Sequence, residues 1–155
     1  MKKGICQWLV VLFVFSFQTA LAQDAAPQGE KPNQLGIRIS SKDAVINHSI
    51  TYRRFLKPDL AVEGLFSFSD PVALGILIEK YKPLGTSGLT WFWGAGAYAG
   101  FGGGRNFGAQ GAVGLDFVFP AVPVNLSIDW KPELNFVKQF SFEPAAVGFS
   151  ARFIF

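Results

Sequence analysis

The sequence predicts an all-β fold: an eight-stranded antiparallel up-and-down transmembrane β-barrel, preceded by a helical signal peptide. Half of the 155 residues are hydrophobic and only 16% are charged, yet after the N-terminus no apolar run reaches the roughly 18 residues of a membrane-spanning helix. Seventeen Gly and 17 Phe argue against a helical bundle, because Gly is costly inside helices. From Leu35 onward apolar and polar residues alternate with a period of two, which indicates strands.

Residues 1–22 have the three parts of a secretory signal peptide: a basic start, the apolar stretch Trp8–Phe17, and Ala20-Leu21-Ala22 before the cleavage point. A permanent membrane anchor is disfavoured because the apolar stretch is short. The single cysteine, Cys6, lies before that stretch, so it is not a lipoprotein cysteine and the mature chain has no disulfide. Residues 23–34 have the composition of a flexible periplasmic tether.

The barrel is expected to occupy residues 35–155. Its first four strands are predicted at 35–41, 46–56, 60–69 and 72–82, separated by turn signals such as Lys57-Pro58-Asp59 and Asp70-Pro71. The last four are predicted at 89–101, 107–119, 124–131 and 145–155. All the connections are short except residues 132–144, which are interpreted as one longer loop.

The two faces of each predicted strand differ in a way that indicates a membrane barrel. One face carries large apolar and aromatic residues, and the other carries Gly, Ala, Ser and charges. Small residues suit the narrow interior of an eight-stranded barrel, while large outward apolar residues suit lipid. The opposite arrangement, a soluble sandwich with solvated charges, is the alternative.

Eight charged residues are predicted to point into the lumen, and their signs balance. They are Arg38, Arg53, Lys131 and Arg152, and Glu63, Glu79, Asp116 and Asp129. Because a buried charge is expensive unless it is paired, we expect them to form an internal salt-bridge network. Glu79 and Asp116 could also be interpreted as paired catalytic carboxylates, but a network explains them without a substrate.

Two rings of outward aromatic residues are predicted, as expected for a barrel that crosses a bilayer. With both termini in the periplasm, one ring would contain Trp91, Trp93, Phe117, Phe119, Phe153 and Phe155. The ring at the other rim would contain Phe66, Phe68, Phe101 and Trp130.

The C-terminal segment Ser150–Phe155 resembles the assembly signal of bacterial outer-membrane β-barrels, which end in Phe after an alternating aromatic strand. The mature chain resembles the small eight-stranded barrels of the OmpA and OmpX kind, and Val124–Pro132 resembles a motif of uncharacterised small outer-membrane barrel proteins. The resemblance implies the gram-negative outer membrane as the location and recognition of Phe155 by the barrel-assembly machinery. The chain departs from the OmpA kind in lacking a peptidoglycan-binding domain, and from OmpX in having short outer loops.

Other candidate sites are weaker. His48, the only histidine, lies beside Ser49, but strand neighbours point to opposite faces, so a nucleophile pair is disfavoured. The glycines of residues 94–104 lack the following helix of a phosphate-binding loop. One His and no mature Cys disfavour a metal site. Three basic residues in predicted outer loops, Lys42, Arg105 and Lys138, could contact lipopolysaccharide phosphates.

The sequence therefore predicts a non-enzymatic outer-membrane barrel with a plugged lumen and a structural or interaction role in the envelope. We expect no catalytic residue, no cofactor and no metal. The expected partners are outer-membrane lipid, lipopolysaccharide and the assembly machinery, with the protein as a monomer. Without Lys2 and Lys3 of the leader the formal charge of +3 falls by two, so no nucleic-acid surface is expected. The alternatives are an outer-membrane lipid-modifying enzyme and a soluble periplasmic, lipocalin-like carrier.

Overall fold

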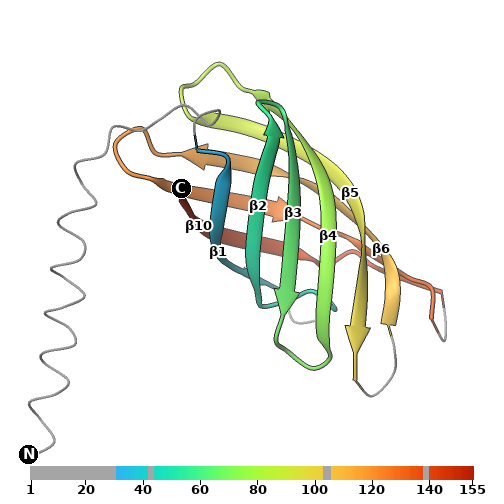
Figure 1. The fold of residues 1–155 in the computed structure, drawn as a ribbon. Coiled ribbons are helices and arrows are strands. Elements are labelled where there is room, and N and C mark those ends of the chain that lie inside the picture. Colours follow the sequence, from blue (N-terminus) through green and yellow to red (C-terminus); the bar gives the residue numbers. More distant parts are fainter. Residues whose placement is uncertain (1–30, 42–43, 103–105, 138–139) are drawn as a thin grey trace, which may run out of the picture.

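The computed structural model describes residues 31–41, 44–102, 106–137 and 140–155 (Figure 1). The predicted signal peptide and residues 23–30 of the predicted tether lie outside the described residues. Ten strands are formed: β1 (Asn33–Ser40), β2 (Ser49–Lys57), β3 (Leu60–Ser67), β4 (Val72–Pro83), β5 (Leu89–Phe101), β6 (Asn106–Val118), β7 (Val124–Trp130), β8 (Glu133–Asn135), β9 (Ser141–Glu143) and β10 (Val147–Ile154).

Eight of these strands close into an antiparallel barrel. The order runs β5-β4-β3-β2-β1-β10-β7-β6, and pairing of β5 with β6 closes the ring. The predicted all-β fold with eight antiparallel barrel strands is thereby confirmed. Within the described part of the chain, no helix is long and apolar enough to cross a membrane.

The start of the barrel differs from the prediction by two residues. β1 begins at Asn33, inside the segment predicted as a tether. The backbone N–H and C=O of Asn33 bond to Phe155, and Gln34 pairs with Ile154, so the ladder extends beyond the first apolar residue, Leu35. The polar Asn33 and Gln34 gave no alternation signal, because Gln34 faces the barrel interior.

The predicted long loop 132–144 contains a short hairpin, β8 and β9, and this is a correction. β8 pairs with Gly108–Gln110 of β6, further along the strand from the residues that pair with β7. β9 pairs with β8, so the hairpin continues the wall along β6 beyond the end of β7. Each piece has three residues and lies beside a proline, Pro132 or Pro144, which left too short a pattern to indicate a strand.

The connection between β1 and β2 folds into the barrel. The sequence predicted a strand from Ile46, but β2 begins at Ser49 and the side chain of Ile46 is completely buried. The backbone N–H groups of Val45 and Ile46 donate to the Glu133 carboxylate instead of to a neighbouring strand. The carboxylate of Glu133 in β8 thus takes the place of the strand-to-strand hydrogen bonds at Val45 and Ile46.

The wall has unequal height. β4, β5 and β6 have 12 or 13 residues, whereas β1, β2, β3, β7 and β10 have between 7 and 9. One side of the barrel is therefore taller, and the β8–β9 hairpin lies beside its extension (Figure 1).

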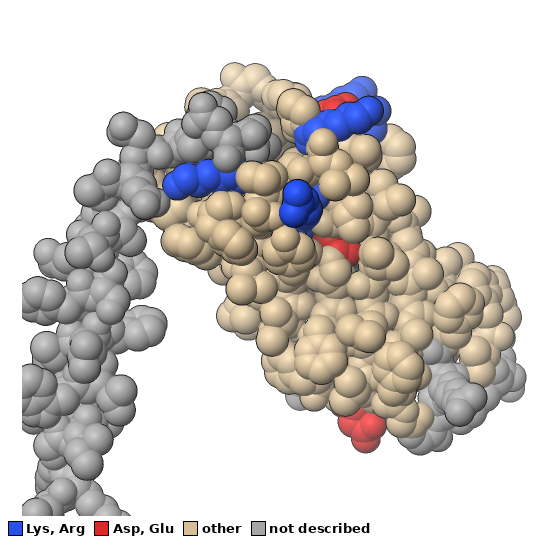
Figure 2. Space-filling model, viewed as in Figure 1, with Lys and Arg blue, Asp and Glu red and all other residues tan. Residues whose placement is uncertain are grey.

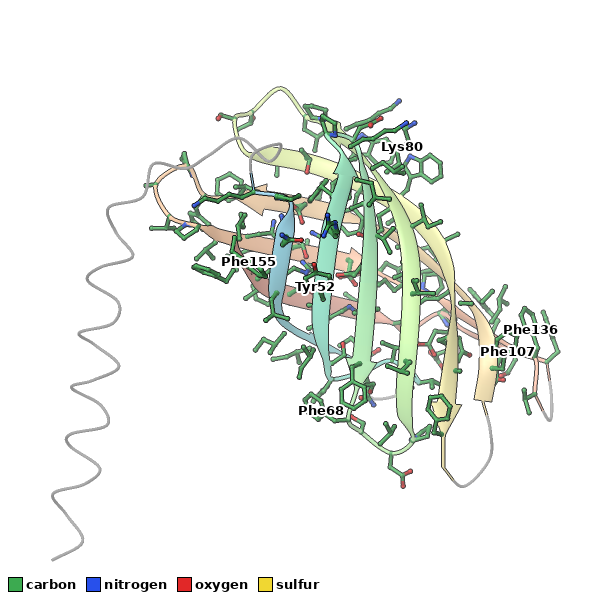
Figure 3. All side chains as sticks on the ribbon, in the orientation of Figure 1. Tyr52, Phe68, Lys80, Phe107, Phe136 and Phe155 are labelled. Carbon is green, nitrogen blue, oxygen red and sulfur yellow. The ribbon has the colours of Figure 1, made fainter. Side chains whose placement is uncertain are left out.

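Apolar side chains cover the outside of the barrel and polar side chains fill most of the inside. On β1, Leu35, Ile37 and Ile39 are exposed, while Arg38 and Ser40 between and beside them are buried. Exposed Tyr52 of β2 and Phe107 of β6 are labelled among these outer side chains in Figure 3. On the face in Figure 2, charged side chains gather mainly toward one end, and uncharged surface covers most of the wall.

Candidate functional site

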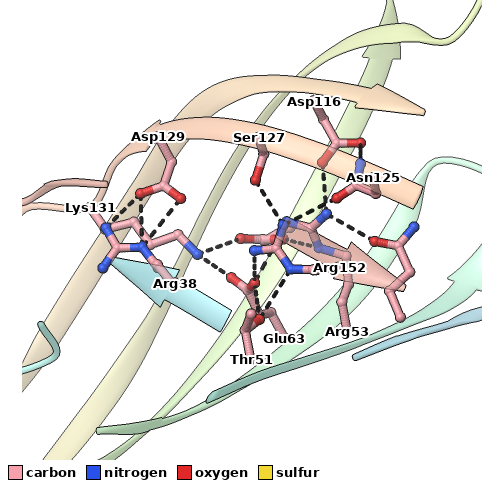
Figure 4. A network of polar contacts seen from close by, with 12 residues as sticks. Arg38, Thr51, Arg53, Glu63, Asp116, Asn125, Ser127, Asp129, Lys131 and Arg152 are labelled. Carbon is pink, nitrogen blue, oxygen red and sulfur yellow. Dashed lines mark hydrogen bonds and ion pairs between the residues drawn. The ribbon is translucent and has the colours of Figure 1, made fainter. Parts of the chain in front are cut away.

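All eight of the predicted lumen charges lie inside the barrel, and none is more than 2% exposed. Six barrel strands supply one residue each: Arg38 from β1, Arg53 from β2, Glu63 from β3, Glu79 from β4, Asp116 from β6 and Arg152 from β10. Asp129 comes from β7, and Lys131 directly follows that strand. The period of two places these residues on inward faces, so they meet inside the barrel; Figure 4 shows the network around Glu63 and Arg152 and the nearby pair of Arg38 and Asp129.

Glu63 is the acidic centre of the network. Its carboxylate forms ion pairs with Lys131 and Arg152, and lies 3.6 Å from Nη2 of Arg53. The hydroxyl of Thr51 donates a further hydrogen bond to Oε1 at 2.6 Å. One carboxylate therefore receives three cations from β2, β10 and the end of β7.

Arg53 is the basic counterpart of Glu63. Its guanidinium pairs with Glu79 at 3.2 Å and with Asp116 at 2.8 Å. It also lies beside two stacked aromatic rings, 5.3 Å from the centroid of Tyr81 and 5.4 Å from that of Phe92, whose centroids are 5.2 Å apart. A guanidinium near aromatic rings is stabilised by cation–π attraction, most strongly when water is excluded. The Tyr81 hydroxyl donates to Glu79 at 2.6 Å, which ties the rings to the ion pairs.

Two ion pairs cross the full width of the lumen. Arg53 on β2 meets Asp116 on β6, and Lys131 after β7 meets Glu63 on β3. β2 and β6, like β3 and β7, are separated by three strands on either side of the eight-stranded ring, so they lie on opposite walls. Side chains from opposite walls therefore meet at the centre of the barrel at this level.

Arg38 and Asp129 form a second, more separate pair. Nη2 of Arg38 lies 2.6 Å from Oδ1 of Asp129, and Nε donates to the same oxygen at 3.0 Å. The guanidinium also donates to the carbonyls of Ile46 and Ala146. Arg38 thereby holds the inward-folded connection to the barrel wall.

Several neutral members of the network were not singled out from the sequence. Arg152 donates to Ser127 at 2.7 Å and to Asn125 at 3.2 Å, and Asn125 donates to Asp116 at 2.6 Å. Asn125 and Ser127 lie on the same inward face as Asp129, and outward apolar residues separate them along the strand. The period of two in the sequence therefore already indicated that they point inward. Thr51 and Tyr81 occupy the same faces as Arg53 and Glu79.

The predicted aromatic residues are all on the outer wall or at its ends. Trp93, Phe153, Phe155, Phe66, Phe68, Phe101 and Trp130 are exposed, while Trp91, Phe117 and Phe119 are half-buried. Phe117 contacts Phe119, and Phe153 stacks near Phe155.

Trp130 was predicted to lie in the aromatic ring at the opposite rim from Trp91 and Trp93, but it lies close to them. It lines the same outer hollow as Trp91, and Val113 of β6 pairs with both Trp93 and Trp130. The reason is the shortness of β7: its last residue lies level with the middle of the 13-residue β6.

Of the weaker candidates, His48 and most of the glycines lie within the described residues. His48 precedes β2, and its Nδ1 has no hydrogen-bond partner in the described part of the protein. The described residues contain no group of three or more His, Cys, Asp and Glu that could hold a metal ion. Lys42, Arg105 and Lys138 lie outside the described residues. The inward glycines make room for lumen side chains: a Cβ on Gly114 would lie 2.8 Å from the Phe92 ring.

No family model, curated protein or solved structure matches this chain. The fold and the site define its class on their own: a closed eight-stranded antiparallel β-barrel whose interior holds a balanced ionic network.

Proposed function

We propose that this protein is a non-enzymatic outer-membrane β-barrel with a plugged, charge-paired lumen and a structural or interaction role in the envelope of a gram-negative bacterium. The observation that carries the proposal is the inverted distribution of side chains. Residues with large apolar side chains cover the outer wall, and the ionic residues meet in the centre.

The outer wall supports contact with lipid. On β4 the outward residues Leu74, Ile76 and Ile78 are between 50% and 59% exposed, and all the other barrel strands carry exposed large apolar residues as well. A soluble monomer rarely exposes continuous apolar patches larger than a few hundred Å². Hydrocarbon, by contrast, is a favourable environment for such a surface.

The closed ladder supports the same location. In a bilayer every backbone N–H and C=O must find a partner within the protein, and only helices and closed barrels achieve this. The pairing of β5 with β6 leaves no open edge among the eight barrel strands.

The interior supports a plugged barrel rather than a pore or a carrier. Arg53–Asp116 and Lys131–Glu63 cross the lumen, and Ile46 fills the interior beyond them. A lipocalin-like carrier needs an apolar cavity, whereas the centre here contains eight charged side chains. Lipid modification would depend on His48, which lacks the carboxylate and Ser geometry of an activated nucleophile in the described residues.

The C-terminus supports assembly by the barrel-assembly machinery. β10 pairs with β1, which joins the two ends of the barrel sequence. Phe149 and Phe153 of β10, and Phe155 directly after it, are exposed and form an alternating apolar pattern. Outer-membrane lipid and lipopolysaccharide are the partners of the outer wall, and the closed ladder requires no second copy.

Fractionation tests the location. The full chain, produced in a gram-negative host, should sediment with the outer membrane, resist extraction by alkaline carbonate and migrate faster on gels before boiling than after. Recovery in the soluble periplasmic fraction would contradict the proposal. For the plug, planar bilayers containing the protein should show no steady channel, and a large constant conductance would contradict it.

A further inference from the structure

The outer part of the lumen differs from the ionic part in what fills it. This region, here named the outer chamber, is lined by Ala73, Gly75 and Leu77 of β4, Tyr98 of β5 and Gln110 of β6. Ala73 and Gly75 carry a small side chain or none, and Ile46 from the β1–β2 connection packs against Gly75. The filling side chain therefore comes from a connection and not from the barrel wall.

The apolar side chain of Ile46 is a poor partner for one polar group in the chamber, the amide of Gln110. The Gln110 side chain reaches across β5 toward β4, because Gly96, its partner on β5, has no side chain. Oε1 of Gln110 and Cδ1 of Ile46 lie 3.5 and 3.6 Å from the point where a Cβ on Gly75 would be. An amide oxygen thus faces the same space as a methyl group.

Among the described residues, neither amide atom of Gln110 has a hydrogen-bond partner, although only 2% of the residue is exposed. The hydroxyl of Tyr98, on the neighbouring strand, is buried and has no partner in the same part of the chain. A buried polar group without a partner is destabilising. These groups supply two donors and two acceptors that Ile46 cannot use.

Ile46 is held by hydrogen bonds that lie outside the barrel ladder, so a ligand could take the place of its side chain. Its backbone N–H donates to Glu133 at 2.9 Å, and its carbonyl accepts from Arg38 at 3.2 Å and from Ser40 at 3.3 Å. None of these bonds belongs to the ladder of the eight barrel strands. Replacing Ile46 in the chamber would therefore break no ladder bond of the eight barrel strands.

We propose that the outer chamber binds a neutral amphiphile, an unbranched alkyl chain with a hydroxyl or amide group, in place of Ile46. The alkyl chain of the ligand packs against Ala73 and Leu77, and the polar group of the ligand forms a hydrogen bond with the amide of Gln110. The buried carboxylate of Glu133 at the mouth disfavours an anionic head group. This inference rests on the proposed function and gives its interaction role a ligand class.

A titration with n-octanol tests the site. The isotope-labelled chain is placed in phosphatidylcholine nanodiscs, and the resonances of the Gly75 backbone amide and the Gln110 side-chain amide are followed. Ile46→Ala removes the competing side chain and should bind n-octanol about tenfold more tightly than the unmodified chain. The matched control Ile154→Ala creates a similar cavity away from the chamber and should bind like the unmodified chain.

Two further measurements test the chemistry. Octanoate, which has a chain of the same length with an anionic head, should bind far more weakly than n-octanol. Gln110→Leu should weaken the binding of n-octanol, because the hydroxyl loses its amide partner, and should raise the thermal midpoint, because the unpartnered amide is gone. A merely structural Gln110 would lower the midpoint when replaced.

Three results would overturn the inference: no shift at Gly75 in any variant, equal tightening by Ile154→Ala, or equal affinity for octanoate. Fractionation of the same variants separates this inference from the proposed function. A barrel that enters the membrane but takes up no n-octanol contradicts only the chamber. A chain that remains soluble and still binds n-octanol with these preferences contradicts only the proposed location.

Discussion

At the scale of single residues, the fit between Arg38 and the wall depends on a missing side chain. A Cβ at Gly148 would lie 2.5 Å from Nη2 of Arg38, the atom that pairs with Asp129. The glycine therefore provides the space in which the ion pair forms.

Gly148→Ala should accordingly destabilise the barrel by about 1–3 kcal/mol, since the guanidinium must move away from Asp129. Urea unfolding of the refolded protein in vesicles measures this free energy. Gly64→Ala is the matched control, because its Cβ would meet only a carbonyl oxygen 3.9 Å away. Equal effects of the two substitutions would contradict the account.

Arg152 contributes one of the three cations around Glu63 and two hydrogen bonds to β7. Arg152→Met should cost about 3–5 kcal/mol, because removal of one partner leaves buried groups uncompensated. The midpoint of urea unfolding reports the loss. Arg54→Met, at an exposed position on the same barrel, should leave the midpoint nearly unchanged; an unchanged midpoint for Arg152→Met would mean that the guanidinium is solvated.

Sequence reasoning reached individual lumen residues because alternation fixes which face a side chain occupies. It placed Arg53 and Asp116 on inward faces but could not show that they lie on opposite walls, since strand order and register determine that. The ring contacts of Arg53 with Tyr81 and Phe92 depend in the same way on three strands at once.

At the scale of elements, the β8–β9 hairpin and the β1–β2 connection act together. The Glu133 carboxylate accepts two backbone N–H groups, from Val45 at 2.7 Å and from Ile46 at 2.9 Å. A residue of the hairpin thus fixes a segment about 87 positions earlier in the chain. The hairpin was not predicted, because three-residue strands next to prolines are too short to show a periodic pattern. The contact was not predicted, because a hydrogen bond between a side chain and a backbone so far away in the sequence has no sequence pattern.

Glu133→Gln should loosen the connection, because a neutral amide offers one acceptor where the carboxylate offers two. Hydrogen exchange at Val45 and Ile46 should accelerate by about tenfold or more, as expected for the loss of a bond to a charged group. Glu143→Gln is the control: within the described residues, the Glu143 carboxylate accepts a hydrogen bond from the nearby Ala145. Unchanged exchange at Ile46 in the Glu133 variant would show that packing alone holds the connection.

At the scale of the whole molecule, polarity is distributed in the reverse of a soluble protein. The eight strands and their alternation followed from the sequence, because an apolar outer wall and a narrow polar lumen impose a strict period of two. The unequal wall height and the inward connection did not follow, since they arise from the way strands of different length meet around the ring.

The direction of the side chains along β4 is the most direct test of the whole account. Single cysteines at residues 73–78, spin-labelled in lipid vesicles, should alternate in their collisions with oxygen, which concentrates in hydrocarbon. Labels at Leu74, Ile76 and Ile78 should be accessible to oxygen and protected from a water-soluble nickel chelate, whereas Ala73 and Leu77 should be protected from both. Accessibility of Leu74, Ile76 and Ile78 to the chelate, or the absence of any alternation, would contradict the claim that the apolar wall faces lipid.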